Sequence, residues 1–484
     1  MTTEEEYVKL VSELIDGIDA GEFSGSLQGI YKYNFKHLEA LFVMLPYLEG
    51  GDQLYRQLYD IVIKCAVDNI KRKTLQNEKI CIRFLVISAA EWSADALYWK
   101  LKNDDRVDCK IIVSPLIDRD KDGMLDSYIQ TYSFFAENNY DVVGGYNIEE
   151  DYIYKFAEIT EQPDMVIHLS PWYTSMPETY RITSYPFDVL NCYIPYCMST
   201  GDSVDGMSQK NFNYNKEFMN FQWRVYTDSS KNLQGFKDNG LLRAKNVRYS
   251  GYLKMDRFLN RKEYNKEEIK KLWKIPESVD VSEVKKVIIA PHHSFLGYAG
   301  IAFSTFKSNA HFLFYLAEKY EKRVSFILKP HPSMRVRAVE AGVFADYTEY
   351  DEYIRKWNAL PNAKVVRETD YLDLFETSDG MIMDSISFLA EYLYVNKPLL
   401  FLRRKGQAFN ELGKCIIESH YSANGEDYKG IEDFLKNIVI NQNDYMQEKR
   451  TAVFEDELNY SKDNGCSACE YIYRDICETL FGYS

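Results

Sequence analysis

The sequence lacks the motifs that most often reveal how a protein handles nucleotides or metals. Its 484 residues contain no G-x-G-x-x-G, no Walker A loop and no H-E-x-x-H. The first two absences argue against a dinucleotide-dependent dehydrogenase and a P-loop NTPase, because both need a glycine-rich turn that lets backbone N–H groups approach phosphate. The chemistry therefore has to be sought in other residues.

Long apolar runs and excess positive charge are also missing. The longest apolar runs, such as LEALFVML and PLLFL, fall far short of the ~20 residues that a membrane-spanning helix needs. No signal peptide precedes the acidic start MTTEEEYVKL. Net charge is −15, with only short basic patches at Lys71–Lys73 and Arg403–Lys405, which argues against nucleic-acid binding. We expect a soluble cytoplasmic protein with at most peripheral contact at the inner face of the membrane.

The nine cysteines do not form a metal-binding pattern. Nine is an odd number, and a cytoplasmic location favours free thiols. Cys466 and Cys469 form one C-x-x-C, but a structural zinc site usually takes four ligands and no second pair exists. An amphipathic helix with small buried thiols explains this segment better than zinc does.

One acidic loop is similar to the start of a calcium-binding EF-hand loop. Asp118, Asp120 and Asp122 alternate there, and Gly123 follows them. The bidentate Glu expected at the twelfth position is replaced by Ile129, which favours a solvated acidic turn over a calcium site. We predict neither a metal nor a cofactor.

The arrangement of apolar segments predicts an α/β protein with two Rossmann-like domains. Short apolar strands such as IRFLVIS and DCKIIVSP alternate with helical segments, and a second such series begins at KKVIIAPHHS. We expect a helical accessory region over residues 1–80, a first domain over 81–260, a second over 261–455, and C-terminal helices over 456–484 that pack back across the domains.

Three loops of the second domain follow strands and carry polar side chains. Because the carboxyl ends of parallel strands share one edge of a sheet, these loops should lie on one rim, where ligands of such domains bind. The loops supply imidazoles, a lysine and hydroxyls, which suit a diphosphate. The residues are His292, His293 and Ser294 in the first loop, Lys329 and His331 in the second, and Asp384, Ser385 and Ser387 in the third.

The third loop has two possible roles. Its serines could cap the next helix, or that helix could aim its N-terminus at a phosphate. Asp384 would repel a diphosphate, so we expect it to turn away and accept hydrogen bonds from backbone N–H groups. The alternative is that it contacts a hydroxyl group of the donor substrate. His311, by contrast, lies on the apolar face of the helical segment NAHFLFYLAEKY, and we expect it to be buried in the protein core.

Several segments resemble the CDP-glycerol glycerophosphotransferase family of teichoic-acid polymerase-like enzymes. FILKPHP and YLDLFETSDGMIMDSISFLAEYLYVNKPLLFL are similar to its C-terminal half, VRYSGYLKMDRFL (Val247–Leu259) to its domain junction, and PHHS to its first donor-side loop. The likeness covers about Ile82 to Leu402. It implies a GT-B fold with two domains facing across a cleft, and transfer of glycerol phosphate or a related polyol phosphate from a CDP-linked donor to a cell-surface or lipid-linked glycan.

The resemblance also assigns roles to residues. His331, Ser385 and Ser387 would hold the diphosphate, and His331 would stabilise the leaving group. The family's polymerases carry a His-Gly pair that supplies the acceptor's base, but the corresponding region here reads NCYIPYCMST, with no His. Glu91, after the first strand, and His168, at a strand end, are the remaining candidates for the base, although each also has an ordinary structural explanation.

Two other functions stay open at this point. One is a GT-B glycosyltransferase that uses a nucleotide sugar in capsule or lipopolysaccharide synthesis. The other is a non-catalytic GT-B-like partner subunit, which the missing His-Gly pair favours and the intact donor-side loops oppose.

Overall fold

The computed structural model describes residues 3–23, 32–202, 213–295, 301–367, 371–386 and 388–482. The chain divides into two compact units. Unit 1 contains Met1–Cys197, Lys210–Lys254 and Tyr460–Ser484, and unit 2 contains Met198–Gln209 and Met255–Asn459. Each unit is built on its own parallel sheet.

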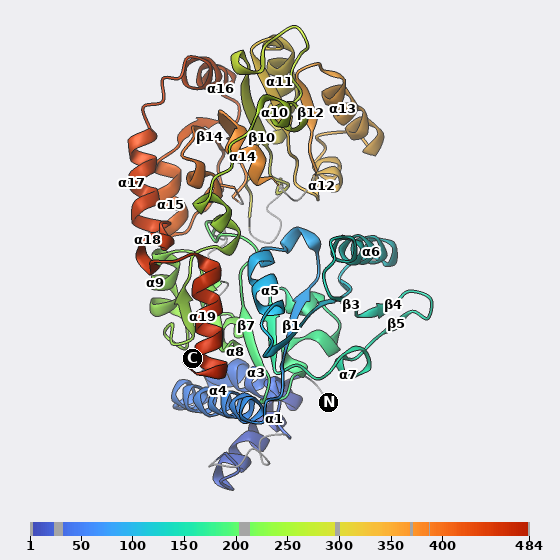
Figure 1. Ribbon diagram of the computed structural model, residues 1–484, viewed down its shortest axis with the longest axis vertical. Coiled ribbons are helices and arrows are strands. Elements are labelled where there is room, and N and C mark those ends of the chain that lie inside the picture. Colours follow the sequence, from blue (N-terminus) through green and yellow to red (C-terminus); the bar gives the residue numbers. More distant parts are fainter. Residues whose placement is uncertain are drawn as a thin grey trace. The chain divides into compact units, whose positions relative to one another are not determined.

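Unit 1 has a seven-stranded parallel sheet in the order β3-β2-β1-β6-β7-β8-β9 (Figure 1). The order runs outward from β1 in both directions, which is the doubly wound arrangement. Its strands are β1 (Ile80–Val86), β2 (Val107–Val113), β3 (Val142–Gly144), β6 (Met165–His168), β7 (Leu190–Tyr193), β8 (Arg224–Thr227) and β9 (Val247–Tyr249). β4 (Tyr146–Asn147) and β5 (Tyr152–Ile153) form a separate hairpin.

Helices accompany this sheet along the chain. They are α5 (Asp95–Lys102), α6 (Lys121–Glu137), α7 (Phe156–Ile159), α8 (Glu217–Phe221) and α9 (Ser230–Asn239). The Asp120 carboxylate caps α6 by accepting the Gly123 N–H at 2.7 Å. The acidic turn considered for calcium is thus, in part, the N-cap of a helix.

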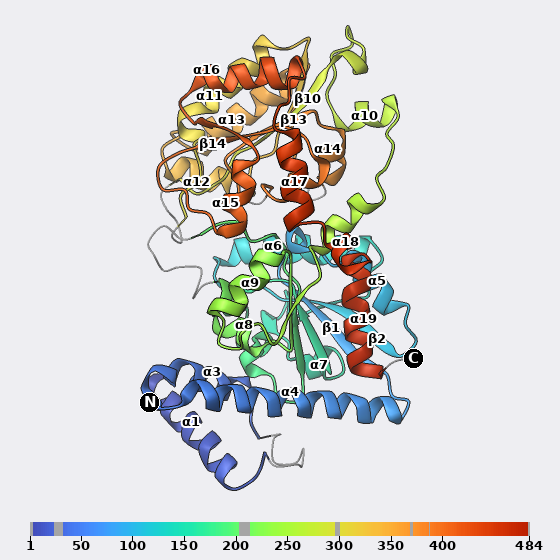
Figure 2. The same cartoon turned by 90° about the vertical axis from the view of Figure 1, so that its left-hand side faces the viewer.

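An N-terminal helical layer covers one end of the unit 1 sheet. It consists of α1 (Thr3–Asp19), α3 (Phe35–Met44) and the long α4 (Gly51–Leu75), which Figure 2 shows running across the strand ends. Tyr55 and Tyr59 of α4 donate to the carbonyls of Asn220 and Gln222, just before β8, at 3.2 and 2.7 Å. The layer therefore lies at the amino ends of the strands and leaves their carboxyl ends for function.

The C-terminal helices α18 (Tyr460–Asn464) and α19 (Ala468–Phe481) return to unit 1. Asp475 of α19 accepts hydrogen bonds from Arg224 Nε and Tyr226 Oη of β8, both at 2.8 Å. Charge-assisted bonds of this kind are stronger than neutral ones. They attach the end of the chain to a strand that precedes it by about 250 residues.

Unit 2 has a six-stranded parallel sheet in the order β12-β11-β10-β13-β14-β15. Numbered along the unit, this is 3-2-1-4-5-6, the order of dinucleotide-binding domains. The strands are β10 (Lys285–Ala290), β11 (Val324–Leu328), β12 (Ala363–Val365), β13 (Gly380–Met383), β14 (Leu399–Arg403) and β15 (Tyr421–Asn424). The interior strands β11 and β13 are buried along their whole length, as expected for a parallel sheet covered on both faces.

Helices precede, connect and follow these strands along the chain. The helices are α10 (Lys266–Leu272), α11 (Phe306–Lys319), α12 (Met334–Glu340), α13 (Tyr347–Ala359), α14 (Leu372–Thr377), α15 (Glu411–Glu418), α16 (Tyr428–Asp433) and α17 (Gln447–Glu457), with a π-helical stretch over Phe434–Ile440. Phe326 of β11 and Trp357 of α13 are fully buried in the core of this unit. The helices thus fix the sheet and leave its loops to carry function.

One expected helix is shorter and later than the sequence predicts. The sequence predicts a helix directly after the loop of Asp384 and Ser385, yet the first regular helical element is a 3₁₀ helix over Glu391–Val395. A five-residue 3₁₀ helix has poorer hydrogen-bond geometry than an α-helix, and its N-terminus lies farther from the loop than expected. Ser387 itself lies outside the described residues.

No helix among the described residues has the length and apolar content needed to cross a membrane.

Candidate functional site

The polar loops of unit 2 meet at the point where its strand order reverses. β10 and β13 are neighbours in the sheet but not in the chain, and the register pairs Ala290 with Met383 at their carboxyl ends. The loops beginning at Pro291 and Asp384 therefore diverge from adjacent strand ends. Open α/β sheets bind ligands in the crevice that such a divergence leaves.

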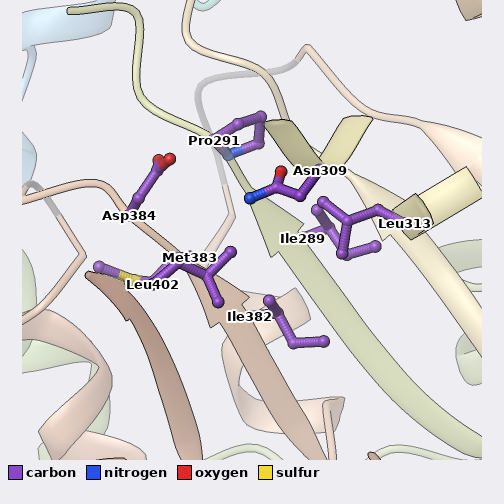
Figure 3. A pocket seen from close by; sticks show the side chains of 8 residues that line it. All are labelled: Ile289, Pro291, Asn309, Leu313, Ile382, Met383, Asp384 and Leu402. Atoms are coloured by element: carbon purple, nitrogen blue, oxygen red, sulfur yellow. The ribbon is translucent and has the colours of Figure 1, made fainter. Parts of the chain in front are cut away.

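Asp384 ties these two loops together. Its Oδ1 accepts the backbone N–H of His292 at 2.6 Å, and its Oδ2 accepts both the backbone N–H and the hydroxyl of Thr305, the latter at 2.8 Å. Figure 3 shows the Asp384 side chain pointing from the end of β13 toward the loop after β10, where Pro291 lies. The prediction that this carboxylate accepts backbone N–H groups and shapes the loop is confirmed.

Burial makes this carboxylate costly to ionise. Asp384 is 1% exposed, and burial raises its pKa to about 6, although the hydrogen bonds from Thr305 and His292 act in the opposite direction. Thr305 is the N-cap of α11. The helix end nearest the loop thus already faces a negative group, Asp384, which a helix N-terminus stabilises.

This finding corrects the expected source of the helix dipole. One of the two roles left open by the sequence was that the helix after Ser385 aims its N-terminus at a phosphate. Instead, that segment contains only a short 3₁₀ helix, and the N-terminus of α11 is matched by a protein carboxylate. Binding of an anion at this rim has to depend on side chains and loop N–H groups.

The hydrogen bonds that Asp384 accepts from His292 and Thr305 form a brace between the two loops. Three imidazoles cluster beside this brace. The rings of His293 and His331 are stacked, with centroids 3.9 Å apart and planes inclined by 29°. His292 lies against both, at 4.4 Å from His293 and 5.8 Å from His331. The loops after β10 and β11, separate in the sequence, therefore bring their histidines together as predicted for one rim.

Hydrogen bonds fix which ring nitrogens carry protons in the neutral state. His331 Nδ1 accepts the Ser333 N–H at 3.1 Å, and His292 Nδ1 accepts the Ser294 N–H at 3.2 Å and lies 2.7 Å from the Ser294 hydroxyl. Each of these rings then carries its proton on Nε2. Two Nε2–H donors are the consequence, and such donors suit phosphate oxygens.

The cluster is held in its neutral form. Burial lowers the pKa of His293 to about 4 and that of His331 to about 3, and it holds the pKa of His292 well below its usual range. Neighbouring positive charges add to this effect, from Lys329 on His331 and from Arg337 on His293. His293 Nδ1 is buried without a partner among the described residues. A bound anion would supply the missing negative charge.

A small cavity lies beneath the brace. Its volume is about 10 Å³, which holds about one water molecule. The lining, drawn in Figure 3, consists of Ile289, Pro291, Asn309, Leu313, Ile382, Met383, Asp384 and Leu402. Asn309 Oδ1 is buried there without a partner among the described residues. The cavity is far too small for a nucleotide, so the candidate site is the rim above it.

The other predicted donor-side residues occupy the same strand ends. Ser294 accepts the Phe303 N–H at 2.9 Å and so shapes the loop after β10. Lys329 follows β11 directly, with its ammonium 5.4 Å from the centre of the Tyr371 ring. Ser385 follows Asp384 and is 6% exposed. These positions agree with the prediction that the three loops lie on one rim of the sheet. Direct contact of these residues with a ligand stays a prediction.

In unit 1 the two candidate bases have different surroundings. His168, at the end of β6, is 1% exposed, and its Nε2 lies 3.1 Å from Asn191 Oδ1. Its ring packs against Tyr185 and Phe218, and burial lowers its pKa to about 4. Glu91 ends the 3₁₀ turn Ala89–Glu91 after β1. The surroundings of His168 are those of a core residue, whereas Glu91 lies at a loop.

The structure also adds residues that the sequence did not single out. Thr305 completes the brace on Asp384, and Asn309 donates to the Thr305 hydroxyl at 2.9 Å. Ser170, two residues after β6, hydrogen-bonds the Glu91 carboxyl. Thr305 and Ser170 are lone hydroxyls in loops, without a spacing pattern that could mark them. His311, expected in the core, is exposed on α11, a correction that follows from its place on the solvent side of that helix.

Comparisons with known proteins agree with this architecture. The family model described as CDP-Glycerol:Poly(glycerophosphate) glycerophosphotransferase matches residues 199–478, more than half of the chain. No curated protein matches the chain significantly.

Structures of the polymerase TagF show the same fold, and that of MnaA is reported beside them. The wall teichoic acid polymerase TagF shares 15% identity at a TM-score of 0.52, over 92% of this chain and 97% of that one. A second structure of TagF, a variant soaked with CDPG, gives a TM-score of 0.51 at 15% identity over the same shares. MnaA from S. aureus, solved with UDP, gives a TM-score of 0.49 at 13% identity, over 84% of this chain and 98% of that one.

The two doubly wound units and the likeness to TagF establish the GT-B fold with an added N-terminal helical region. The family match begins in the first segment of unit 2, includes Lys210–Lys254 of unit 1, and continues through the polar loops of unit 2 into α19. The chain therefore belongs to the CDP-glycerol:poly(glycerophosphate) glycerophosphotransferase family and is a transferase.

Proposed function

We propose that this enzyme transfers glycerol phosphate, or a closely related polyol phosphate, from a CDP-activated donor to a hydroxyl group of a teichoic-acid-type glycan, free or lipid-linked. Family membership supports the class of reaction. The observation that carries the choice of site is the imidazole cluster of His292, His293 and His331 at the strand ends of unit 2.

The reaction sets clear demands on this site. The acceptor oxygen attacks the phosphorus of the glycerol phosphate group, and the bond from that phosphorus to the bridging oxygen breaks. CMP leaves with the bridging oxygen and its new negative charge, while the acceptor's proton passes to a base. Fixed donors aimed at the developing charge accelerate such a step, typically by about 10²–10³ for each donor.

His331 is placed to be such a donor. Its Nδ1 is committed to the Ser333 N–H, so the neutral ring keeps Nε2–H for a ligand. The prolines on either side, Pro330 and Pro332, restrict the backbone that carries it. In the proposal His331 stabilises the leaving phosphate, and His292 and His293 bind the diphosphate beside it.

Four further residues belong to the proposed donor site, three by direct contact and one indirectly. Ser385 and Ser387 donate hydrogen bonds from their hydroxyl groups to phosphate oxygens, although Ser387 lies outside the described residues. Lys329 supplies positive charge from the end of β11. Asp384 acts indirectly, because its two carboxylate oxygens are occupied by the loop that it braces.

The test is an assay of donor specificity. Purified protein is incubated with poly(glycerol phosphate) or a lipid-linked glycan primer and with CDP-glycerol, CDP-ribitol or a UDP-sugar. We expect CMP release from a CDP-polyol, matched mole for mole by labelled polyol phosphate in the acceptor. Release of UDP from a UDP-sugar would instead establish a glycosyltransferase.

Calorimetry with CDP, CMP, UDP and GDP provides the second part of the test. We expect CDP to bind more tightly than CMP, because the diphosphate contacts the imidazole cluster. Absence of binding by all four nucleotides would contradict the proposal and favour a non-catalytic partner subunit.

A further inference from the structure

A short segment from the middle of the chain lies against the loop of Asp384 and Ser385. The segment, residues 199–202, belongs to unit 2. The Thr200 hydroxyl donates to the carbonyl of Ile386, which follows 186 positions later in the chain, at 3.1 Å. Ile386 comes directly after Ser385, the residue that the proposed function places against a phosphate. One hydroxyl thus holds this loop from a distant part of the sequence.

Asn410 anchors the 199–202 segment to unit 2. Its backbone N–H donates to the Thr200 carbonyl at 3.1 Å, and its Nδ2 donates to the Ser199 carbonyl at 2.7 Å. The same side chain caps α15 by accepting the Gly413 N–H at 2.7 Å. A Cβ atom at Gly413 would overlap the Thr200 carbonyl oxygen, so the close approach of the segment to α15 requires glycine there. The segment is therefore built into the packing of unit 2.

The 199–202 segment also contacts the loop after β14. Gly201 forms an isolated antiparallel bridge with Phe409, and the Asp202 N–H donates to the Ala408 carbonyl at 2.9 Å. Gly201 faces Ile386 as well, because a Cβ atom at Gly201 would lie only 3.0 Å from Ile386 Cδ1. Since β14 pairs with β13 in the sheet, the segment touches the loops of two neighbouring strands at their carboxyl ends.

Thr200 and Asp384 hold the donor-side loop on the two sides of Ser385. Asp384, before Ser385, binds the backbone N–H of His292 in the loop after β10. Thr200 binds the carbonyl of Ile386, after Ser385. Ser385 lies between these fixed points and is 6% exposed. A binding group that is already held in place costs less entropy to order when its ligand arrives.

The Ile386 carbonyl does not depend on Thr200 for a partner. It also accepts the Leu389 N–H at 3.3 Å, and a carbonyl oxygen has two lone pairs. Removal of the Thr200 hydroxyl would therefore leave this acceptor paired, although Thr200 itself is 1% exposed. The second bond adds direction to the carbonyl more than it satisfies a buried group. Its main consequence is the placement of the loop.

We propose that Thr200 is a positioning residue for the donor substrate, and that its bond to Ile386 holds the loop of Asp384 and Ser385 in the form that receives the diphosphate of a CDP-linked donor. The inference rests on the proposed function and concerns unit 2 alone. Thr200 touches neither the phosphates nor the reacting atoms, because its hydroxyl is committed to the Ile386 carbonyl.

The first experiment measures CDP binding by calorimetry in Thr200→Val and Thr200→Ser. Valine removes the hydroxyl, whereas serine keeps it. We expect the Kd for CDP to rise about 3–10-fold in Thr200→Val, the scale of one lost hydrogen bond between uncharged groups. Thr200→Ser should bind CDP as tightly as the wild type.

Thr200→Ala guards against misfolding of the valine variant. A valine methyl group in place of the hydroxyl would press on the Ile386 carbonyl oxygen, which lies 3.1 Å from the Thr200 hydroxyl oxygen. Alanine removes the same hydroxyl and places no atom there. We expect Thr200→Ala to raise the Kd for CDP to a similar extent.

Thr377→Val is the matched control. Thr377 is a buried threonine of the same unit, and its hydroxyl donates to the Asp373 carbonyl at 2.7 Å and accepts the Trp273 Nε1–H at 2.8 Å. It ends α14, before β13 begins, so it lies at the opposite end of that strand from the donor-side loop. The variant should lower the melting temperature at least as much as Thr200→Val does and leave the Kd for CDP unchanged.

Steady-state kinetics separate positioning of the donor substrate from a general loss of activity. In Thr200→Val the KM for the CDP-polyol should rise by the same factor as the Kd for CDP, while kcat changes less and the KM for the acceptor stays the same. A threonine that serves the fold alone would lower the melting temperature and leave the KM values unchanged.

The outcomes distinguish this inference from the proposed function. Wild-type CDP affinity in folded Thr200→Val or Thr200→Ala would overturn the role of Thr200, and so would a loss of affinity that Thr200→Ser or Thr377→Val shares. If the wild-type protein itself bound no CDP, the proposed function would fail instead.

Discussion

The Oδ1 atom of Asp384 accepts the backbone N–H of His292 across the strand-order reversal of unit 2, at 2.6 Å. One carboxylate thus holds the loop that carries the first two histidines in register with the loop that carries Ser385. The same carboxylate also binds the N-cap residue of α11, so we expect Asp384 to position the proposed donor site without touching the donor.

Replacing Asp384 by Asn should weaken the fold more than it changes donor choice. Asn has a single acceptor oxygen, so its NH₂ group would face one of the N–H or O–H donors of His292 and Thr305. Loss of a hydrogen bond to a charged group and an unpaired buried donor should lower the free energy of unfolding by about 2–3 kcal/mol. Urea denaturation measures this change.

Thr305→Val is the matched control for that experiment. It removes the hydroxyl bond to Asp384 and the bond that the hydroxyl accepts from Asn309, and it keeps the backbone bond to Asp384. The loss of stability should therefore be smaller than in Asp384→Asn. An Asp384→Asn variant of wild-type stability that prefers a different nucleotide would show instead that Asp384 contacts the donor.

Replacing His331 by Ala should abolish most transfer without unfolding the protein. The side chain is half-buried, and its proposed work is to stabilise charge on the leaving phosphate. We expect kcat to fall about 10²–10³-fold. His311→Ala, an exposed histidine of the same unit, should keep full activity. Wild-type turnover in His331→Ala would show that the leaving-group role is wrongly assigned.

Ser385→Ala should weaken CDP binding rather than stability. A lost hydrogen bond to a charged group costs about 1–3 kcal/mol, or roughly 5–150-fold in Kd. Calorimetric titration gives the Kd, and a thermal melt gives the stability. If Kd were unchanged and the melting temperature lower, the serine would serve the loop alone, as the structural interpretation of the sequence suggested.

Acid should destabilise the protein in part through His168. Its pKa is about 4 in the folded state and near 6.5 ordinarily, so the unfolded chain binds the proton first as the pH falls. Its contribution to stability is complete above pH 6.5 and is lost between 6.5 and about 4, at about 1.4 kcal/mol per pH unit. His168→Gln should flatten the pH dependence of the urea midpoint by that amount.

The sign of this effect distinguishes the histidine from the buried acids. Asp384 has a raised pKa, so the folded state binds its proton first and stability falls as the pH rises from about 3.8 to about 6. The difference between wild type and His168→Gln isolates the histidine from that opposing change. An equally steep acid dependence in the variant would mean that His168 is protonated in the folded protein.

Transfer should not need a divalent metal. Within the described residues, no group of three or more His, Cys, Asp or Glu side chains is placed to hold an ion. The proposed donor site instead meets the diphosphate with imidazoles, hydroxyls and Lys329. We expect full activity in EDTA, measured as CMP release. A strict magnesium requirement for the chemical step would contradict this part of the account.

The sequence predicts the strand ends well, because parallel strands buried on both faces form continuous apolar runs. KKVIIA and VSFIL appear as β10 and β11, and the polar residues directly after them are the ones that the structure brings together. Such predictions need only local pattern and the rule that carboxyl ends share an edge.

Two features of the site depend on long-range packing and cannot be predicted from local sequence patterns. The helix after Ser385 was predicted from composition, but Glu391–Val395 forms a 3₁₀ helix with all five of its side chains buried, so tertiary packing decides its form. The Asp384–Thr305 bond joins residues 79 positions apart, and a lone threonine carries no signal of it. Likewise, His311 shows that an apolar surrounding sequence does not by itself place a side chain in the core.

The most direct test of the central claim is a crystal structure with CDP bound, with occupancy checked by calorimetry. The account predicts the diphosphate at the carboxyl ends of β10, β11 and β13, with a phosphate oxygen within hydrogen-bond distance of His331 Nε2 and another near Ser385. CDP bound elsewhere, with the imidazole cluster untouched at saturating nucleotide, would contradict it.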